Sequence, residues 1–351
     1  MSRLSDLTTL RLGGPAKQII EASTETELID AVQQADAQSE PLLVLAGGSN
    51  VVIADEGFPG TVVRLLTKGI ERDGDVFTVQ AGELWDPFVE RTVRDGLAGI
   101  ECLSGIPGTV GATPIQNVGA YGQEVSETIT SVRVHDRNSG ETRELAPEEC
   151  GFTYRSSVFK RTPNRWVVLA VTYALDRQPH SKPIRYPELA RELGIDPHDT
   201  APLEQVREAV LRLRRGKGMV VDPDDPDSVS AGSFFTNPIL DASEFAELEQ
   251  RTEAKLGEKP PRFAEPDGRI KTSAAWLVER AGYARGYGDA TAIALSSKHT
   301  LALTNRGAGT ATQLLALARE IAGGVKAEFG VDLVPEPVLV GHAWAEAVER
   351  S

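Results

Sequence analysis

A glycine-rich segment, residues 105–122, holds the pattern in this chain that is most typical of ligand binding. Glycine occurs in it at Gly105, Gly108, Gly111, Gly119 and Gly122. Glycine lets backbone N–H groups approach a ligand closely, and successive N–H groups in turns bind anions. We therefore interpret the segment as a backbone cradle for a diphosphate. Its two side-chain amides, at positions 116 and 117, could pair with a phosphate or with the edge of a flavin.

A second, shorter loop has the same character. Gly47, Gly48, Ser49 and Asn50 follow an apolar run that predicts a strand. Either loop alone is more often an ordinary turn, but two in one chain favour binding of a phosphate-bearing ligand. The chain contains neither G-x-G-x-x-G nor G-x-x-x-x-G-K-[ST], so neither a Rossmann nor a P-loop site is indicated.

A third segment, residues 231–238, holds one hydroxyl in a loop of small residues. Ser233 is followed by two phenylalanines and is not part of a G-x-S-x-G elbow, which argues against an esterase nucleophile. Two interpretations remain: a turn serine that caps a backbone group, or a general acid that protonates a carbanion or enolate. Together with the diphosphate cradle, the second interpretation favours a flavin enzyme that reduces a carbon–carbon double bond.

Several charged residues are candidates for gripping an anionic substrate. Arg155 follows Tyr154 and could hold a carboxylate with two parallel hydrogen bonds, or it could be a surface arginine. Glu336 lies between two prolines and could polarise a substrate, or it could be an exposed charge at a sheet edge. A basic cluster at 212–217 suits a diphosphate, but it also suits a solvated helix end.

The composition argues against several classes of protein. The chain has 351 residues, with 37 Lys and Arg against 51 Asp and Glu, and its formal net charge is −14. So acidic a chain lacks a broad attraction for nucleic acid or anionic membranes, and we expect small-molecule partners and a monomer. The N-terminus has no signal-peptide core, and no apolar run reaches the ~20 residues of a membrane span, so we expect a cytoplasmic protein. Cys102 and Cys150 are interpreted as reduced thiols, and the histidine spacing predicts no metal site.

The elements that must position these residues alternate between strands and helices. The capping box Thr24-x-x-Glu27 predicts a helix start, and apolar residues at helical spacing predict helices near 85–95, 203–215 and 314–329. The acidic, proline-rich segment 222–228 predicts a loop. Predicted strands lie at 42–46 (buried), 61–66, 76–81, 130–136, 141–145, 166–175 and 331–340, the last broken by Pro335 and Pro337. We expect an α+β protein with three domains, at 1–67, 68–221 and 222–351. The sequence leaves open whether the last residues return to the first domain.

Taken together, these segments resemble the UDP-N-acetylenolpyruvoylglucosamine reductases (MurB). The segment 184–189 is similar to the tyrosine-bearing insertion in the long form of that family. The resemblance covers nearly the whole chain, and it rests on the combination of segments and not on any single one. The segments are 8–14, 47–50, 105–122, 154–159, 232–238, 271–277 and 335–337.

The resemblance implies a fold, cofactors and a reaction. The fold is of the vanillyl-alcohol-oxidase (PCMH) type, with two α+β subdomains that bind FAD and a C-terminal α+β domain that binds the substrate. FAD is bound without a covalent link and is reduced by NADPH. The flavin then gives hydride to the methylene carbon of an enolpyruvyl ether, and protonation of the neighbouring carbon yields the lactyl ether of UDP-N-acetylmuramate. The implied role is in peptidoglycan synthesis, and hence in cell wall biogenesis, cell shape and cell division.

The resemblance also implies roles for individual residues. Ser233 matches the proton donor, and Arg155 and Glu336 match the pair that stabilises the enolate. The substrate-binding residues are Tyr154, Tyr186, Lys217, Asn237 and Lys271. The cofactor-binding residues expected from the two glycine loops are Gly47, Gly48, Ser49, Asn50, Gly105, Pro107, Gly108, Gly111, Ala112, Gln116, Asn117, Gly119, Ala120, Tyr121 and Gly122.

Two other functions remain open from the sequence. One is a different FAD-dependent oxidoreductase of the same fold that acts on a small alcohol or sugar, although the 105–122 segment itself contains no His or Cys that could tether a flavin covalently. The other is a nucleotide-sugar-binding module without catalysis. A yellow protein that NADPH bleaches would separate the enzymes from the binding module.

Overall fold

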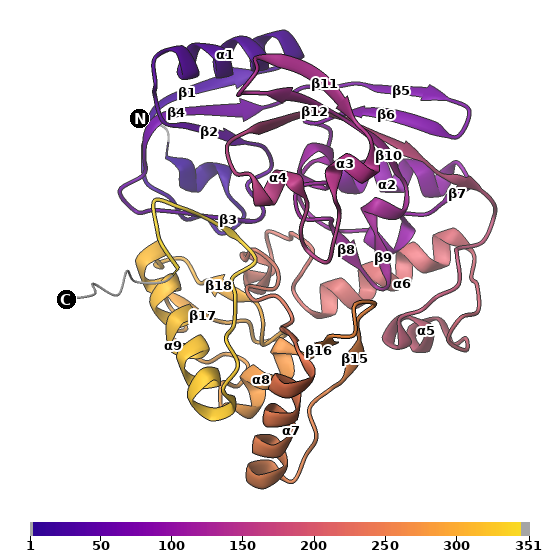
Figure 1. Ribbon diagram of the computed structural model, residues 1–351, viewed down its shortest axis with the longest axis vertical. Coiled ribbons are helices and arrows are strands. Elements are labelled where there is room, and N and C mark those ends of the chain that lie inside the picture. Colours follow the sequence, from indigo (N-terminus) through magenta and orange to yellow (C-terminus); the bar gives the residue numbers. More distant parts are fainter. Residues whose placement is uncertain (1–2, 345–351) are drawn as a thin grey trace. The chain divides into compact units, whose positions relative to one another are not determined.

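The computed structural model describes residues 3–344, and the chain divides into two compact units. Unit 1 consists of Ala16–Gly48 and Phe58–Val220, and unit 2 consists of Arg3–Pro15, Ser49–Gly57 and the chain from Val221 onward. Figure 1 labels the helices and strands of both units. The domain boundaries expected from the sequence stay a prediction, and residues 1–2 and 345–351 of those domains lie outside the described residues.

The first sheet of unit 1 is parallel and carries one helix. Its strands have the order β1-β4-β2, with β1 at Ala16–Ala22, β4 at Phe58–Leu65 and β2 at Leu42–Leu45. The predicted capping box is confirmed, because Thr24 and Glu27 each accept a hydrogen bond from the other's backbone at the start of α1, Glu25–Ala37. The expectation of a buried strand at 42–46 is wrong in part. Strand β2 is an edge strand, so no strand pairs with it on one side, and Leu45 is its only fully buried residue.

The second sheet of unit 1 is antiparallel and has the order β11-β10-β12-β6-β5. The predicted hairpin is confirmed: β10, Ile129–Asp136, pairs with β11, Glu141–Leu145. The central strand β12, Trp166–Ala174, is buried along most of its length because neighbours cover both flanks. The remaining strands are β6, Val76–Gln80, and β5, Ile70–Asp73.

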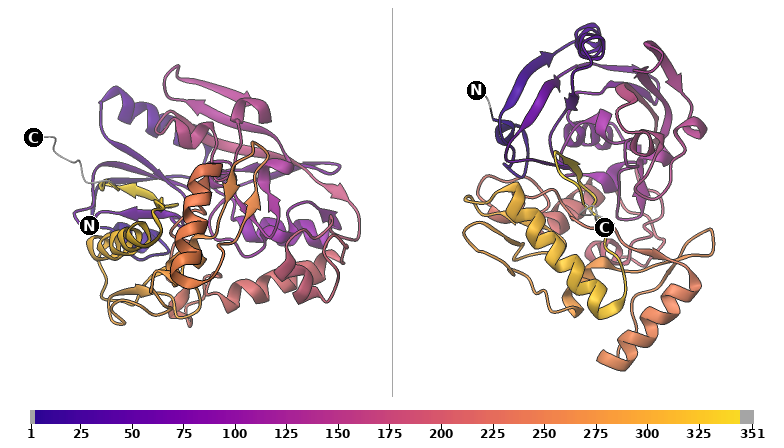
Figure 2. Two further views of the ribbon diagram at one scale, coloured as in Figure 1. Left: turned by 60° about the horizontal axis from the view of Figure 1, so that its bottom comes forward. Right: turned by 60° about the vertical axis from the view of Figure 1, so that its left-hand side comes forward.

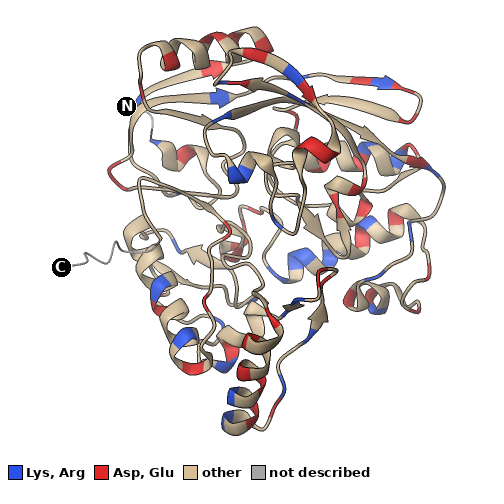
Figure 3. Cartoon of the chain, viewed as in Figure 1, with Lys and Arg blue, Asp and Glu red and all other residues tan. Residues whose placement is uncertain are grey.

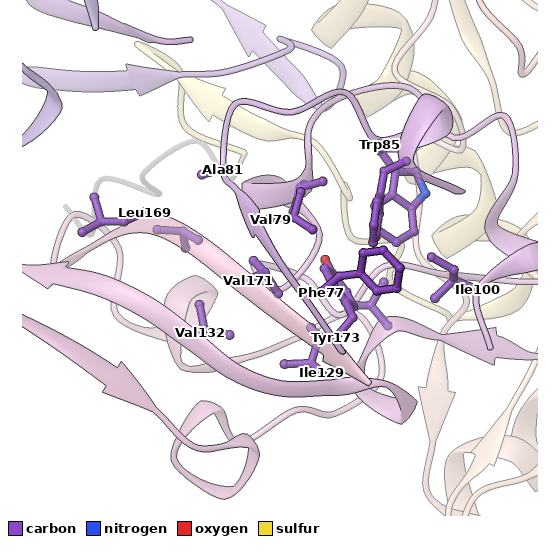
Figure 4. Close-up of a cluster of buried hydrophobic side chains, with 14 of the residues drawn as sticks. Phe77, Val79, Ala81, Trp85, Ile100, Ile129, Val132, Leu169, Val171 and Tyr173 are labelled. Carbon is purple, nitrogen blue, oxygen red and sulfur yellow. The ribbon is translucent and has the colours of Figure 1, made fainter. Parts of the chain in front are cut away.

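Both sheets contribute to one apolar core. Helix α2, Trp85–Arg94, buries its predicted face with Trp85, Phe88, Val89 and Val93. The rings of Trp85 and Phe88 contact Tyr173 of β12, with ring centroids 5.9 Å and 5.5 Å apart. Figure 4 shows Trp85, Phe77 and Tyr173 of this core close together. The indole N–H of Trp85 donates to the carbonyl of Leu103 at 3.0 Å, so the core also fixes the chain that leads into the glycine-rich segment.

The rest of unit 1 consists of short elements and two helices near its C-terminal end. Helices α5 and α6 share a small core with Cys102. The bounds are β7 Leu97–Ala98, β8 Gly119–Ala120, β9 Gln123–Glu124, α3 Pro147–Cys150, α4 Val158–Arg161, β13 Asp176–Arg177, α5 Pro187–Leu193 and α6 Leu203–Gly216, with 3-10 turns at Glu101–Leu103, Val110–Ala112 and Val125–Glu127.

Unit 2 is built around the long helix α9, Ala311–Phe329, which Figure 2 shows from two further sides. The predicted apolar stripe is buried, from Leu314 to Phe329, and Gly330 ends the helix in the left-handed conformation. The other bounds are β3 Val51–Ile53, β14 Ile239–Leu240, α7 Ala242–Leu256, β15 Phe263–Ala264, β16 Ile270–Lys271, α8 Ala274–Arg280, β17 Ile293–Leu295, β18 Leu303–Asn305 and β19 Val338–Val340, with 3-10 turns at Leu4–Leu7 and Pro226–Ser228.

The last strand is shorter than the sequence predicts. β19 starts only after Pro337 and pairs in parallel with β3. The prolines at 335 and 337 lack the N–H that a ladder needs, so regular pairing with β3 begins at Val338. Within residues 3–344 no helix is both long enough and apolar enough to cross a membrane.

Candidate functional site

The two glycine loops of the sequence touch within unit 1. A Cβ added at Gly47 would lie 2.8 Å from the Cα of Gly108, which is closer than side-chain carbons come to backbone. Gly105, Gly108 and Gly122 have positive φ values, of 71°, 110° and 84°. At Gly111 an added Cβ would meet Ala81 at 2.4 Å. The glycines are therefore required by close backbone approach and by left-handed turns, as an exposed backbone cradle needs.

Two contacts, one partly buried and one buried, hold the ends of the glycine-rich segment. At the first end, Asp86 accepts a hydrogen bond from the N–H of Gly105 at 2.6 Å and a bidentate pair from Arg207 at 2.6 and 2.9 Å. Burial alone would raise the pKa of Asp86, but the hydrogen bonds of Arg207 and Gly105 outweigh it and the pKa is lowered. Sequence reasoning missed both residues, because nothing local marks a carboxylate on one helix as the partner of an arginine on another.

The far end is closed by an amide. The side chain of Gln123 donates to Glu101 at 2.9 Å and accepts from the N–H of Cys102 at 2.8 Å. Glu101 is fully buried and also accepts from the N–H of Gly99 at 2.6 Å. Residues just before and just after the glycine-rich segment are thus hydrogen-bonded to each other, which fixes the distance between its two ends. This pairing was also missed from the sequence.

The side chain of Asn117 is used within the loop itself. It is 1% exposed, and its amide nitrogen donates to Glu124 at 2.7 Å and to the carbonyl of Thr153 at 3.2 Å. Its amide oxygen accepts from the N–H of Ser126 at 3.2 Å. The backbone of Asn117 has a φ of 46°, in the left-handed region. The residue therefore shapes the loop, and its predicted contact with the cofactor stays a prediction. Gln116 is only half-buried.

Arg155 lies against the glycine-rich segment. Its guanidinium donates to the carbonyl of Gly119 at 2.6 Å and lies 5.4 Å from the ring centre of Tyr154. Its backbone has a φ of 52°, an uncommon value for a residue with a side chain, inside a tight turn closed between Thr153 and Ser156. This uncommon backbone conformation occurs at a predicted catalytic residue, whose side chain contacts the glycine-rich segment at Gly119.

A second cluster of unit 1 joins three of the predicted ligand-binding residues. The rings of Tyr121 and Tyr186 meet edge to face, with centroids 5.4 Å apart. The ammonium of Lys217 lies 5.7 Å from the centre of the Tyr121 ring and forms an ion pair with Glu188 at 2.6 Å. Burial raises the pKa of Tyr121 to about 12; Arg214 opposes this rise and Glu188 adds to it.

The basic cluster at the end of α6 divides into buried and exposed members. Figure 3 shows Lys and Arg gathered at this end of the helix. Arg214 is buried, and burial lowers the pKa of its guanidinium, while Tyr121 and Asp86 act to raise it. Arg212 and Arg215 are exposed. The interpretation as a merely solvated helix end therefore fails for Arg214, which packs beside Gly105.

In unit 2 a short backbone ladder joins the predicted proton donor to the predicted glutamate. The N–H of Phe234 donates to the carbonyl of Leu301 at 2.7 Å, and the carbonyl of Phe234 accepts from the N–H of Glu336 at 2.8 Å. Residues 235 and 335 form a bridge next to it. Ser233 directly precedes Phe234, so the structure brings Ser233 and Glu336 to neighbouring backbone segments. The buried rings of Phe234 and Phe235 meet edge to face and anchor this ladder in the core.

The other predicted residues of unit 2 have identified partners. Asn237 accepts a hydrogen bond from the N–H of Ala274 at 3.0 Å, at the start of α8. Lys271 on β16 forms an ion pair with Glu265 at 2.6 Å. The loop 47–50 spans both units: Gly47 and Gly48 belong to unit 1, while Ser49 and Asn50 belong to unit 2, where the amide of Asn50 donates to the carbonyl of Glu336 at 3.4 Å.

The acidic segment 222–228 is anchored by a buried carboxylate. Asp227 is 3% exposed and accepts hydrogen bonds from the N–H and the hydroxyl of Ser297, at 2.8 and 2.6 Å, and from Arg306 at 2.6 Å. Burial raises the pKa of Asp227, but the bonds from Ser297 and Arg306 outweigh it and the pKa is lowered. Asp225 pairs with Lys298 at 2.9 Å. The sequence predicted a loop here but not that it would be tied down just before Ser233.

Two further features bear on chemistry. Among residues 3–344 no group of three or more His, Cys, Asp and Glu side chains is placed to hold a metal ion. Cys102 and Cys150 are both buried free thiols. The glycine-rich backbone, with the guanidinium of Arg214 beside Gly105, fits an anion such as the diphosphate of a dinucleotide.

Comparison with known proteins places the chain in one family. Residues 16–146 match the model of an FAD binding domain, and residues 224–340 match that of the UDP-N-acetylenolpyruvoylglucosamine reductase C-terminal domain. The UDP-N-acetylenolpyruvoylglucosamine reductase of Streptomyces coelicolor is 56% identical over 343 residues, which cover 97% of this chain and 89% of that protein. The one of Thermobifida fusca is 55% identical over 345 residues, which cover 96% of both chains.

A solved structure agrees with these matches. The crystal structure of the reductase (MurB) from Thermus caldophilus aligns with a TM-score of 0.65 and 27% identity over 97% of each chain. The expected fold, an FAD-binding α+β part followed by the C-terminal α+β domain, is thereby confirmed. On the strength of identity above one half across nearly its whole length, this chain belongs to the UDP-N-acetylenolpyruvoylglucosamine reductase family.

Proposed function

We propose that this protein reduces the enolpyruvyl double bond of UDP-N-acetylglucosamine-enolpyruvate to the lactyl ether, with FAD as cofactor and NADPH as the source of electrons. The product, UDP-N-acetylmuramate, serves peptidoglycan synthesis. The observation that carries the proposal is 56% identity over 97% of the chain to a protein named for this activity. The alternative, an oxidoreductase of the same fold acting on a small alcohol or sugar, is not favoured by any of the relatives compared.

We propose that the glycine loops hold the diphosphate of FAD. The close approach of Gly47 to Gly108 and the left-handed turns at Gly105 and Gly122 support this, because they leave bare backbone where side chains would stand. The Asp86–Gly105 and Glu101–Gln123 contacts keep the cradle in shape before the cofactor arrives. When bound, FAD supplies the hydride that adds to the methylene carbon.

Ser233, Arg155 and Glu336 are proposed as the catalytic residues. Hydride addition beside a carboxylate builds negative charge on that carboxylate as an enediolate. An arginine fork aimed there stabilises the transition state more than the ground state, and Glu336 in its protonated form would donate a second hydrogen bond to the enediolate. The hydroxyl of Ser233 then gives its proton to the neighbouring carbon. The anchored backbone around Phe234 supports this role, since a proton donor to carbon must be held still.

The substrate's UDP part is proposed to bind Tyr186, Lys217 and Asn237, with Lys271 and Tyr154 also contributing. The packing of Tyr186 and Lys217 around one ring, that of Tyr121, supports joint action of the first two. The acidic composition supports small-molecule partners over nucleic acid. We further propose that the protein is a cytoplasmic monomer, which light scattering of the purified protein would test.

Stopped-flow absorbance under anaerobic conditions tests the whole proposal. NADPH should bleach the flavin band of the purified protein, and the enolpyruvyl substrate should restore it with formation of one lactyl ether per turnover. The alternative would be supported if an alcohol or sugar bleached the oxidised flavin and the enolpyruvyl substrate did not reoxidise the reduced flavin. A colourless protein that takes up no added FAD would overturn the proposal.

A further inference from the structure

Two ion pairs join helices α5 and α6 at successive turns of α5. Glu188 pairs with Lys217 at 2.6 Å, and Glu192 pairs with Arg212 at 2.8 Å. The two glutamate side chains are similarly exposed, 36% for Glu188 and 31% for Glu192. The pairs differ in their surroundings, because only the first lies beside residues proposed to bind the substrate.

The surroundings of Glu188 form one electrostatic cluster. Its partner Lys217 also faces the ring of Tyr121, which packs against Tyr186. Burial raises the pKa of both tyrosine hydroxyls, and the carboxylate of Glu188 raises them further. The negative charge of Glu188 is therefore felt by every member of the cluster, and a diphosphate arriving there would be repelled by it as well as attracted by Lys217.

We propose that Glu188 occupies the anionic partner position of Lys217 in the ligand-free protein and so sets the affinity for the UDP part of the substrate. A phosphate can pair with the ammonium of Lys217 only by displacing the carboxylate, so binding exchanges one ion pair for another. The inference deepens the proposed function and rests on it. It identifies Glu188, which the sequence did not single out, as a residue that weakens binding and thereby keeps the UDP-bearing ligand from binding too tightly to leave.

The test compares matched variants of the flavin-loaded, full-length protein. Glu188→Gln keeps the size and removes the charge, and Glu192→Gln makes the same change one helical turn away. Calorimetric titration of the oxidised proteins with UDP-N-acetylglucosamine-enolpyruvate, without NADPH, gives Kd. We expect Kd to fall about two- to fivefold in Glu188→Gln, the range for a partly exposed ion pair, and to stay unchanged in Glu192→Gln. Added salt should shrink the difference.

A further pair of variants separates competition from mere folding effects. In a Lys217→Gln background, Glu188→Gln should no longer tighten binding, because the two residues act on one another. Glu188→Ala replaces Glu188→Gln if the latter loses flavin or melts at a lower temperature. Equal or weaker binding by the Glu188 variants than by the wild type would overturn the inference, since it would mean that the carboxylate orients Lys217 for the ligand. A wild type that binds no UDP-bearing ligand would overturn the proposed function itself.

Discussion

The residues proposed for chemistry are held by different means in the two units. In unit 1 the glycine loops depend on the absence of side chains: Gly47 and Gly111 stand where a Cβ would meet backbone or another Cβ at less than 3 Å. In unit 2 Ser233 and Glu336 are held by added contacts: the backbone hydrogen bonds of Phe234, and the segment 222–228, which Asp227 anchors to Ser297. A cradle for a cofactor needs open backbone, whereas a proton donor needs an immobile one.

This difference has a consequence for substitutions. Adding an atom should be damaging in the glycine loops of unit 1, since no space is left for it. Removing the Ser233 side-chain oxygen should be harmless to the fold, because no hydrogen bond of the ladder passes through it. The predictions below follow from this contrast, from the largest expected effect to the smallest.

The largest effect is expected from Ser233→Ala. A general acid contributes about 10²–10⁴-fold to a rate, so reoxidation of the flavin by the enolpyruvyl substrate should slow by at least that factor. The flavin content, the melting temperature and the rate of bleaching by NADPH should match those of the wild type. Stopped-flow absorbance measures both half-reactions.

Ser233→Cys is the companion variant, and it should recover part of the lost rate because a thiol can also donate a proton. If Ser233→Ala instead slows bleaching by NADPH or releases flavin, the contrast between the units breaks down. Ser233 would then belong with the cofactor-binding residues.

Asp227→Ala should destabilise unit 2 through its anchor. The carboxylate and Arg306 are both largely buried, and removal of one partner from a buried pair typically costs about 3–5 kcal/mol. Asp225→Asn is the control, because it keeps an oxygen for the N–H of Asp227 and removes only the ion pair with the partly exposed Lys298, and such pairs contribute at most about 1 kcal/mol. Urea unfolding of the two variants measures the difference, and similar losses in both would show that Asp227 is not the anchor.

Gly47→Ala should lower the flavin content. The added Cβ would lie 2.8 Å from Gly108, so one loop must shift, at a cost of about 1–3 kcal/mol. Gly216→Ala is a control in the same unit, where nothing lies within 4 Å of an added Cβ. The flavin-to-protein absorbance ratio after dialysis measures the effect. If Gly47→Ala retains as much FAD as the control, the close contact between Gly47 and Gly108 is not needed for FAD binding.

The smallest effect is expected from lowering the pH, which should reduce the stability of unit 1 before that of unit 2. His135 on β10 is 1% exposed, neither of its ring nitrogens has a hydrogen-bond partner among the described residues, and burial lowers its pKa from 6.5. Asp36 and Asp136 oppose this shift, and Arg137 adds to it. The unfolded chain therefore takes up a proton below about pH 6.5 that the folded unit resists, so stability falls there as pH falls, by at most about 1.4 kcal/mol per pH unit.

Asp227 in unit 2 behaves differently. Its pKa is lowered from 3.8, so the stability it contributes is present above that value and is lost only as pH falls below it. His135→Leu should flatten the dependence of unfolding free energy on pH between 6.5 and 4, measured by urea titration at several pH values. The same slope in the variant and the wild type would assign the acid sensitivity to other groups.

Much of the fold followed from local patterns. The capping box at Thr24 and the hairpin between β10 and β11 could be predicted because each depends on residues a few positions apart. The helix α9 and its end at Gly330 followed in the same way from apolar spacing. The candidate residues themselves came from loop composition and from the resemblance of several segments to one family.

The amino-acid sequence by itself indicated helices α1, α2, α6 and α9, strands β4, β6, β10, β11 and β12, the glycine loops and the resemblance to the family. It did not indicate helix α7 or strand β1. Only the tertiary structure decided that Gly47 meets Gly108, that Asp86 holds Gly105, that Glu188 takes the ammonium of Lys217, and that Asp227 anchors the segment before Ser233. The physical reason is that such contacts join residues tens of positions apart, and their geometry is set by how sheets and helices pack. Local propensity and periodicity carry no information about which distant charge or backbone group a side chain will meet.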